Sequence, residues 1–129
     1  RVLRKLVFIG PALLPRSSCE WQAHWPAAVR AGATVPQLEA LGNWEDSGEF
    51  SPAERAALVC TDGIVLRGGA SPESVAGLRR HFSPGECIEL ILTAGFYVCV
   101  SATLHSLAIE ADPNTAEEAL AVYTRLIRS

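Results

Sequence analysis

The chain has 129 residues, enough for one domain built around a single core of ordinary size. Hydrophobic residues account for 49% of the sequence and charged residues for 19%, a balance that excludes a disordered chain and a solvated coiled coil. The net charge of -3 provides neither a basic surface for nucleic acid nor a polybasic anchor for a membrane, so we expect neither partner.

Seven segments are expected to be helical, and no long segment shows the alternation of a strand. In chain order they cover residues 1–14, 17–31, 35–41, 52–66, 72–81, 84–109 and 115–128. They predict a single all-α domain over residues 1–129, built as an antiparallel helical bundle. The chain contains no Met and begins at Arg1, so we also expect that it lacks an N-terminal segment.

Four of these helices begin with the spacing of a capping box, in which Ser or Thr is followed three residues later by Glu or Gln. The boxes are TVPQ, SPAE, SPGE and TAEE, which begin at Thr34, Ser51, Ser83 and Thr115. In SPAE and SPGE a proline occupies the first helical position, where its missing N–H is tolerated. The stretch SPES, at Ser71, starts in the same way without the Glu.

The helix predicted over 84–109 is apolar on nearly all sides. Its fifteen residues between Glu89 and His105 are too few to cross a bilayer, which favours a buried helix. A helix without a polar face must lie at the centre of its domain or face another subunit. We therefore expect a homo-oligomer.

The four cysteines are Cys19, Cys60, Cys87 and Cys99, and none of them belongs to a CxxC pair. Dispersed cysteines in apolar helical segments indicate reduced, buried side chains rather than a disulfide framework. This pattern favours a cytoplasmic protein.

The stretch CEWQAHW carries the strongest candidate site. At helical spacing Ser17, Glu20 and His24 share one face, and Trp21 lies close to it. A carboxylate one turn before a histidine can accept a hydrogen bond from the ring N–H, which fixes the tautomer and raises the basicity of the ring. The pair is a candidate for general acid/base catalysis. A surface helix contact and a metal site, with His105 as the only further ligand to suggest, stay open as alternatives.

Two further residues on the helix over 84–109 are candidates for a substrate pocket. Tyr97 and His105 are eight residues apart and so lie roughly on one face. They either line a cavity, together with Ser17 and Trp21, or are satisfied residues of the core.

Five blocks of the sequence fall in the order of a known family. They are RKLVFIG at 4–10, CEWQAHWPAAVRAGATVPQLEAL at 19–41, FSPAERAALVCTDGIV at 50–65, LRRHFSPGECIELIL at 78–92 and GFYVCVSATLHSLAIEAD at 95–112. Together they resemble the carboxymuconolactone decarboxylase / alkylhydroperoxidase D-like family over nearly the whole of 1–112. The resemblance implies an all-α fold, a small-molecule site around the Glu-Trp-x-x-His element, and a homo-oligomer, which we expect to be a dimer, trimer or hexamer.

The peroxidase branch of that family carries CxxCxxxH and an acidic residue far upstream. His24 falls on the histidine of this motif, while Ser17 and Glu20 stand where its two cysteines would be. Lys5 replaces the upstream glutamate, and Cys19 stands where a neighbouring branch usually has tyrosine. Thiol peroxidase chemistry needs an attacking thiolate and a resolving thiol. The resemblance therefore implies that this pathway has no nucleophile here.

The decarboxylase branch implies a reaction that needs no cofactor and no metal. His24 would be the general acid/base and Glu20 its orienting partner or a second acid. Lys5 either pairs with Glu20, binds a substrate carboxylate or enolate oxygen, or extends to water. We expect a small carboxylic acid, β-keto acid or lactone that undergoes decarboxylation or a related isomerisation or cyclisation. The alternatives are a non-catalytic ligand-binding or structural member of the fold and an alkylhydroperoxidase-type peroxidase.

Overall fold

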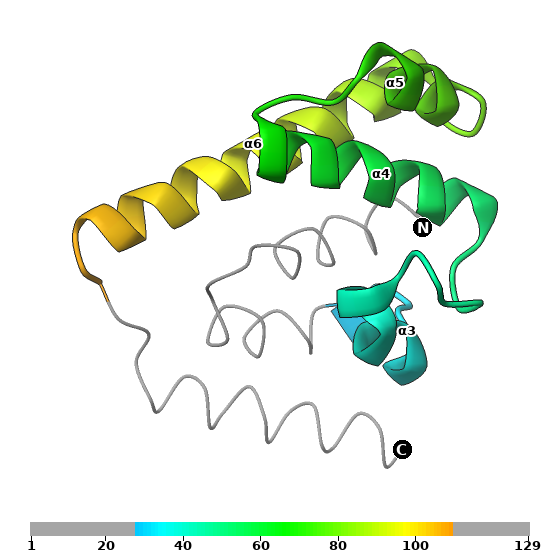
Figure 1. The fold of residues 1–129 in the computed structure, drawn as a ribbon, viewed down its shortest axis with the longest axis horizontal. Coiled ribbons are helices and arrows are strands. Elements are labelled where there is room, and N and C mark those ends of the chain that lie inside the picture. Colours follow the sequence, from blue (N-terminus) through cyan, green and yellow to red (C-terminus); the bar gives the residue numbers. More distant parts are fainter. Residues whose placement is uncertain (1–27, 110–129) are drawn as a thin grey trace.

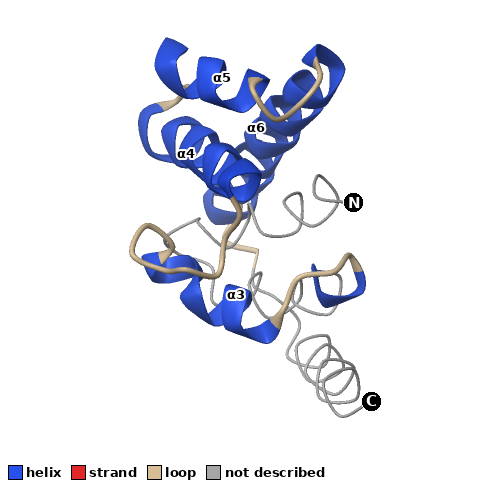
Figure 2. Ribbon diagram, turned by 90° about the vertical axis from the view of Figure 1, so that its right-hand side faces the viewer, coloured by secondary structure: helices blue, strands red, loops and turns tan. Residues whose placement is uncertain are grey.

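The computed structural model describes residues 28–109. They contain α3 (Val35–Ala40), the 3-10 helix η2 (Leu41–Asn43), α4 (Pro52–Arg67), α5 (Pro72–Arg79) and α6 (Pro84–Ser106). No strand occurs in this range, so the all-α prediction is confirmed for it (Figure 2). The helices expected over 1–14 and 115–128, most of the one over 17–31, and the capping box at Thr115 lie outside the described residues.

The described helices begin where the capping signals predict. In the box of α4 the Ser51 N–H donates to Glu54 Oε2 at 2.8 Å, and the Glu54 N–H donates to Ser51 Oγ at 3.3 Å. The boxes at Thr34 and Ser83 have the same reciprocal pair of bonds. Ser71 caps α5, because its Oγ accepts a hydrogen bond from the backbone N–H of Ser74. These bonds satisfy N–H groups that have no partner inside the helix.

The helix ends differ from the prediction by one to three residues. The structure ends α4 at Arg67 because Gly68, with φ 76°, turns the chain in the left-handed region that favours glycine. It ends α6 at Ser106 rather than at residue 109. Beyond Ser106 the backbone is no longer α-helical, since Ala108 has a φ of 50°. C-terminal ends depend on such local turns, which carry a weaker sequence signal than the N-terminal caps.

The helices α4 and α6 run in the same general direction. The carboxyl ends of both lie toward the left in Figure 1. Ala57, near the start of α4, shares a hydrophobic cluster with Cys87, near the start of α6. This pair of helices is therefore parallel, while the antiparallel bundle predicted for residues 1–129 as a whole stays a prediction. The eight-residue α5 lies between the two helices in sequence. The chain turns back through α5, so that α6 can run in the same direction as α4.

Two hydrophobic clusters lie along α4. The first joins α4 to α3, η2 and the loop after η2; its buried members are Ala28, Ala33, Leu38, Leu41, Trp44, Phe50 and Leu58. The second joins α4 to α5 and α6; its buried members are Ala57, Cys60, Leu78, Cys87 and Leu90. Because α4 contributes to both, it is the element through which they are connected.

The long helix α6 is less buried than the sequence led us to expect. Its 23 residues include four that are buried, namely Cys87, Leu90, Ala94 and Ser101. By length and composition it could cross a membrane, and only 22% of its most apolar stretch is buried, unlike the core helix of a globular domain. The fifteen-residue apolar run therefore does not exclude a span by its length, because the helix that contains it is longer.

Candidate functional site

The predicted Glu–His site lies outside residues 28–109. This applies to Lys5, Ser17, Glu20, Trp21 and His24. Two candidate pocket residues, Tyr97 and His105, do lie in the described part of the chain, both on α6.

Tyr97 and His105 occupy different environments. Tyr97 is half-buried, and its ring meets that of Phe96 edge-to-face, with centroids 5.9 Å apart. His105 is exposed, and its Nδ1 lies 2.8 Å from the carbonyl oxygen of Ser101. The same nitrogen lies 3.3 Å from Ser101 Oγ, so both contacts tie the His105 ring to the preceding turn of α6.

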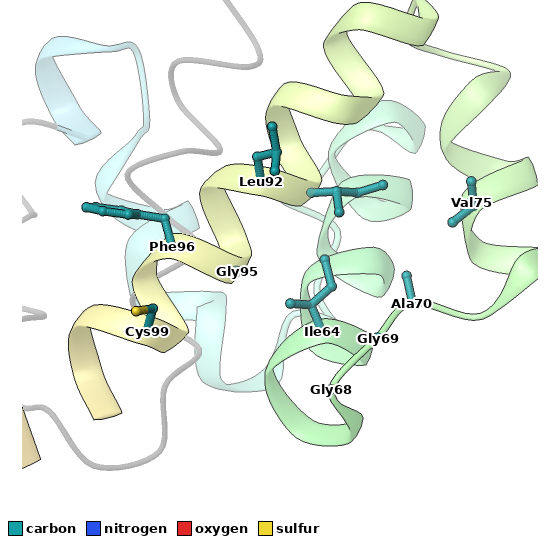
Figure 3. A pocket seen from close by; sticks show the side chains of 10 residues that line it. Ile64, Gly68, Gly69, Ala70, Val75, Leu92, Gly95, Phe96 and Cys99 are labelled. Carbon is teal, nitrogen blue, oxygen red and sulfur yellow. The ribbon is translucent and has the colours of Figure 1, made fainter. Parts of the chain in front are cut away.

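An open apolar groove of about 800 Å³ lies between the carboxyl end of α4 and the middle of α6 (Figure 3). Its described lining consists of Ile64, Gly68, Gly69, Ala70, Val75, Ile91, Leu92, Gly95, Phe96 and Cys99. Neither Tyr97 nor His105 belongs to this lining. A groove of this volume is within the range of small-molecule sites.

A close approach of backbone to backbone forms one wall of the groove. The Gly69 N–H donates to the Gly63 carbonyl oxygen at 3.2 Å, which holds the loop after α4 against that helix. A Cβ at Gly63 would stand 3.0 Å from the Cα of Ala70 and 3.1 Å from the Gly69 oxygen. Only a glycine allows this contact without a shift of the loop. On the opposite wall, a Cβ at Gly95 would meet nothing within 4 Å.

The groove offers little chemistry of its own. Among the lining residues that the structure describes, the thiol of Cys99 is the sole polar side-chain group. Cys99 is exposed, contrary to the expectation that the cysteines are buried, whereas Cys60 and Cys87 are buried as expected. Burial raises the pKa of the Cys60 thiol; a hydrogen bond with Ser74 opposes this effect. A buried thiol with a raised pKa is a poor nucleophile, which supports a structural role.

A buried polar pair joins α3 to the start of α4. Gln37 Nε2 donates to the Glu49 carbonyl oxygen at 2.7 Å and to Glu54 Oε2 at 3.3 Å. Gln37 and Glu54 are 6% and 5% exposed, and both belong to capping boxes. Since their polar atoms are engaged with caps and backbone, we interpret the pair as structural. Each box is visible in the sequence, but their meeting is not, because it depends on how two helices pack.

A second polar cluster fixes the loop after η2. Trp44 Nε1 donates to Asp62 Oδ2 at 3.0 Å, and the Arg55 guanidinium lies 5.5 Å from the centroid of the same ring. Arg55 also donates to the carbonyl oxygens of Trp44, Glu45 and Ser47. Desolvation raises the pKa of the Asp62 carboxyl, although the bond from Trp44 opposes it. Sequence reasoning missed this cluster, since its members are far apart in the chain and form no motif.

Metal chemistry finds no support in this part of the chain. Across residues 28–109, no three His, Cys, Asp or Glu side chains are grouped so that they could hold a metal ion.

Comparison with models of known families and with curated proteins found no match for the chain. The resemblance drawn from the five sequence blocks therefore stays a prediction.

Proposed function

We propose that the chain is a cofactor-independent acid/base enzyme that resembles carboxymuconolactone decarboxylase. The proposal rests on one observation, the one-turn spacing of Glu20 and His24 in CEWQAHW, within blocks that follow the order of that family. The all-α character of residues 28–109 supports it, because the family is all-α. The proposed enzyme works in the cytoplasm as a homo-oligomer, and its substrate is a small carboxylic acid, β-keto acid or lactone.

The proposed chemistry needs only a proton donor and a site for negative charge. When a β-keto acid loses CO2, the electrons of the broken C–C bond pass into the carbonyl group and form an enolate. Lys5 would stabilise the enolate oxygen, and protonated His24 would deliver a proton to the carbon. Glu20 would accept a hydrogen bond from the other ring N–H and so hold the imidazole in position. Isomerisation or cyclisation of a lactone would use the same proton transfers.

A second candidate is a non-catalytic ligand-binding member of the fold. The apolar groove between α4 and α6 favours it, since its described lining contains neither an acid nor a base. Such a protein would bind an apolar ligand there, and Glu20 and His24 would be a surface pair on their helix.

The test is to replace Glu20 and His24 separately by Ala and to follow CO2 release from a panel of β-keto and lactone acids. We expect His24→Ala to lower kcat by about 100-fold or more, the usual contribution of general acid/base catalysis. Glu20→Ala should lower it less, because its role is to orient the ring. His81→Ala, at an exposed histidine beyond α5, is the matched control and should keep full turnover.

Three results would contradict the proposal. Undiminished turnover in His24→Ala would remove the acid/base role, and loss of folding in both variants would make the pair structural. Turnover of peroxide with a thiol donor, lost in Cys19→Ser, would support the peroxidase instead.

A further inference from the structure

The described structure leaves an apolar face of α6 exposed, and part of this face also forms the α6 wall of the groove. Ile88, Leu92 and Phe96 are 59%, 67% and 63% exposed, and Cys99 is also exposed. Their spacing of four, four and three residues places them on one face, opposite the buried Leu90 and Ala94. We call these four residues the α6 stripe. At these exposures its three large side chains present on the order of 400 Å² of apolar surface, as much as the largest patch on a typical monomer.

The side chains on this face change in size along the helix. Two of the large ones, Ile88 and Leu92, lie in the first half, and the third, Phe96, lies at the middle of the helix on one edge of the face. Gly95, Cys99, Ala102 and Ser106 follow at alternating spacings of four and three residues, and all are small. Alternation of three and four residues is the spacing of a seam between two packed helices. The face is therefore wide in its first half and hollow in its second.

Such a face is complementary to a second copy of itself only when the two helices are antiparallel. With a two-fold axis at the level of Tyr97, Leu92 of one copy stands opposite Ala102 of the other. Ile88 then stands opposite Ser106, and Gly95 opposite Cys99. Each of these three layers places a larger group against a smaller one, and each contact occurs twice, as in an isologous dimer. Phe96, one residue from the level of the axis, lies beside its own copy at the edge of the pair. A parallel pair in register would instead set large against large and leave gaps between the small residues.

The charges favour the same orientation. From Leu90 to Ile109 the sequence contains no Asp, Glu, Lys or Arg, whereas Glu86 and Glu89 lie in the first two turns of α6. In the antiparallel pair the two Glu89 carboxylates are about 24 Å apart along the axis, at 1.5 Å per residue. A parallel pair would bring them level, where like charges repel. In an antiparallel pair the two helix macrodipoles also point in opposite directions, which is favourable for helices that lie side by side.

We infer that α6 is a self-association surface, on which two copies of the chain pack antiparallel through the α6 stripe about a two-fold axis near Tyr97. This gives the proposed homo-oligomer a specific interface and rests on that part of the proposed function. The helix is about 35 Å long, and the stripe supplies about half of the roughly 800 Å² per partner of a standard interface. The small residues of the second half of α6, together with Leu107 and Ile109, extend it.

The experiment measures the association state of the full chain by sedimentation over a wide concentration range. Leu92→Asp sets a charge in the apolar layer and should raise the dimer dissociation constant at least about tenfold. Leu66→Asp is the matched control, because Leu66 is 62% exposed on α4 and lies outside the stripe. It should leave the dissociation constant unchanged.

Gly95→Leu tests the layered packing itself. A Cβ at this position meets nothing within 4 Å in the single chain, and Gly95 faces the open groove, so the fold should tolerate a longer side chain. It adds apolar surface but would collide with Cys99 of the second copy, and we expect weaker association. Flotation with phosphatidylcholine vesicles is measured in parallel, because a bilayer is the other apolar partner that α6 could take.

Several outcomes would overturn the inference. If the chain is monomeric at every concentration, the proposed self-association is wrong. The acid/base proposal is tested separately, by the His24→Ala variant. A dimer that is unaffected by Leu92→Asp would place the interface elsewhere. Stronger association in Gly95→Leu would mean unspecific apolar contact, and vesicle binding that this variant strengthens would mean a membrane-facing helix.

Discussion

At the scale of single residues, the ionisation of Asp62 depends on two opposed effects. Desolvation raises the pKa of its carboxyl above the ordinary value of 3.8, and the indole N–H of Trp44, 3.0 Å away, opposes that rise. Glu45 adds to the rise and Arg67 opposes it. Because the raised pKa means that the fold holds this proton more tightly than the unfolded chain does, protonation of Asp62 favours the folded state.

The sign of the pH dependence follows from that comparison. The contribution of Asp62 to the free energy of unfolding is fully present when the pH is below 3.8, the ordinary pKa of the carboxyl. It is lost as the pH rises through the higher pKa of the folded state. Asp62→Asn keeps an oxygen that can accept from Trp44 and removes the titration. We expect its free energy of unfolding, relative to the wild-type chain, to increase as the pH rises from acid to neutral. Urea unfolding at a series of pH values measures this difference.

Asp46→Asn controls for the change in net charge, because Asp46 is an exposed carboxylate in the loop beside Trp44. Its difference from the wild-type chain should not rise in the same way. A free energy of unfolding of Asp62→Asn that falls relative to the wild-type chain as the pH rises would show that the charge-assisted bond from Trp44 outweighs desolvation.

At the scale of elements, the sequence specifies the beginnings of helices better than their ends or their packing. Thr34, Ser51 and Ser83 could be identified as caps because a capping box is a local interaction, complete within four residues. The contact of Gln37 with Glu54 could not, since it depends on how α3 and α4 pack. The direction of α6 relative to α4 depends in the same way on long-range contacts.

The candidate site shows the same division. The groove could not be predicted because the role of Gly63 depends on a loop that folds back onto α4, and an isolated glycine inside a helix does not reveal its neighbour. The exposed position of Cys99 was missed because apolar periodicity does not tell a buried face from a face without a partner. For the Glu20–His24 pair, the sequence is the whole basis of the assignment.

Two glycines in neighbouring elements should respond oppositely to the same change. Gly68 ends α4 with φ 76°, and a Cβ there meets nothing within 4 Å, so Gly68→Ala strains only the backbone. We expect it to lower the free energy of unfolding by about 1 kcal/mol. Gly77 lies inside α5, where a Cβ also meets nothing within 4 Å. Gly77→Ala should raise the free energy by about 0.4–1 kcal/mol.

Both values can be read from urea midpoints, and each variant is the control for the other, since both add one methyl group at an open position. Shifts of the same sign in the two variants would show that backbone conformation does not set the effect.

At the scale of the whole described region, the position of α4 between two clusters determines how the parts depend on one another. Leu58 lies in the cluster shared with α3, while Ala57 and Cys60 lie in the one shared with α5 and α6. Consecutive residues of one helix thus pack into different clusters. If α4 is stable only when both of its sides are covered, loss of either cluster removes the support of the other.

This coupling predicts that Leu58→Ala and Leu78→Ala destabilise the same unfolding transition. Both side chains are fully buried, each at 1% exposure or less, one in each cluster. Truncation of a buried leucine costs about 2–5 kcal/mol. Unfolding by urea should stay a single transition in both variants, with the same midpoint by circular dichroism and by tryptophan fluorescence. Leu66→Ala, at an exposed position of α4, should shift the midpoint little. Two separate transitions, or hydrogen exchange that accelerates only around the altered cluster, would mean that the clusters unfold independently and that α4 does not couple them.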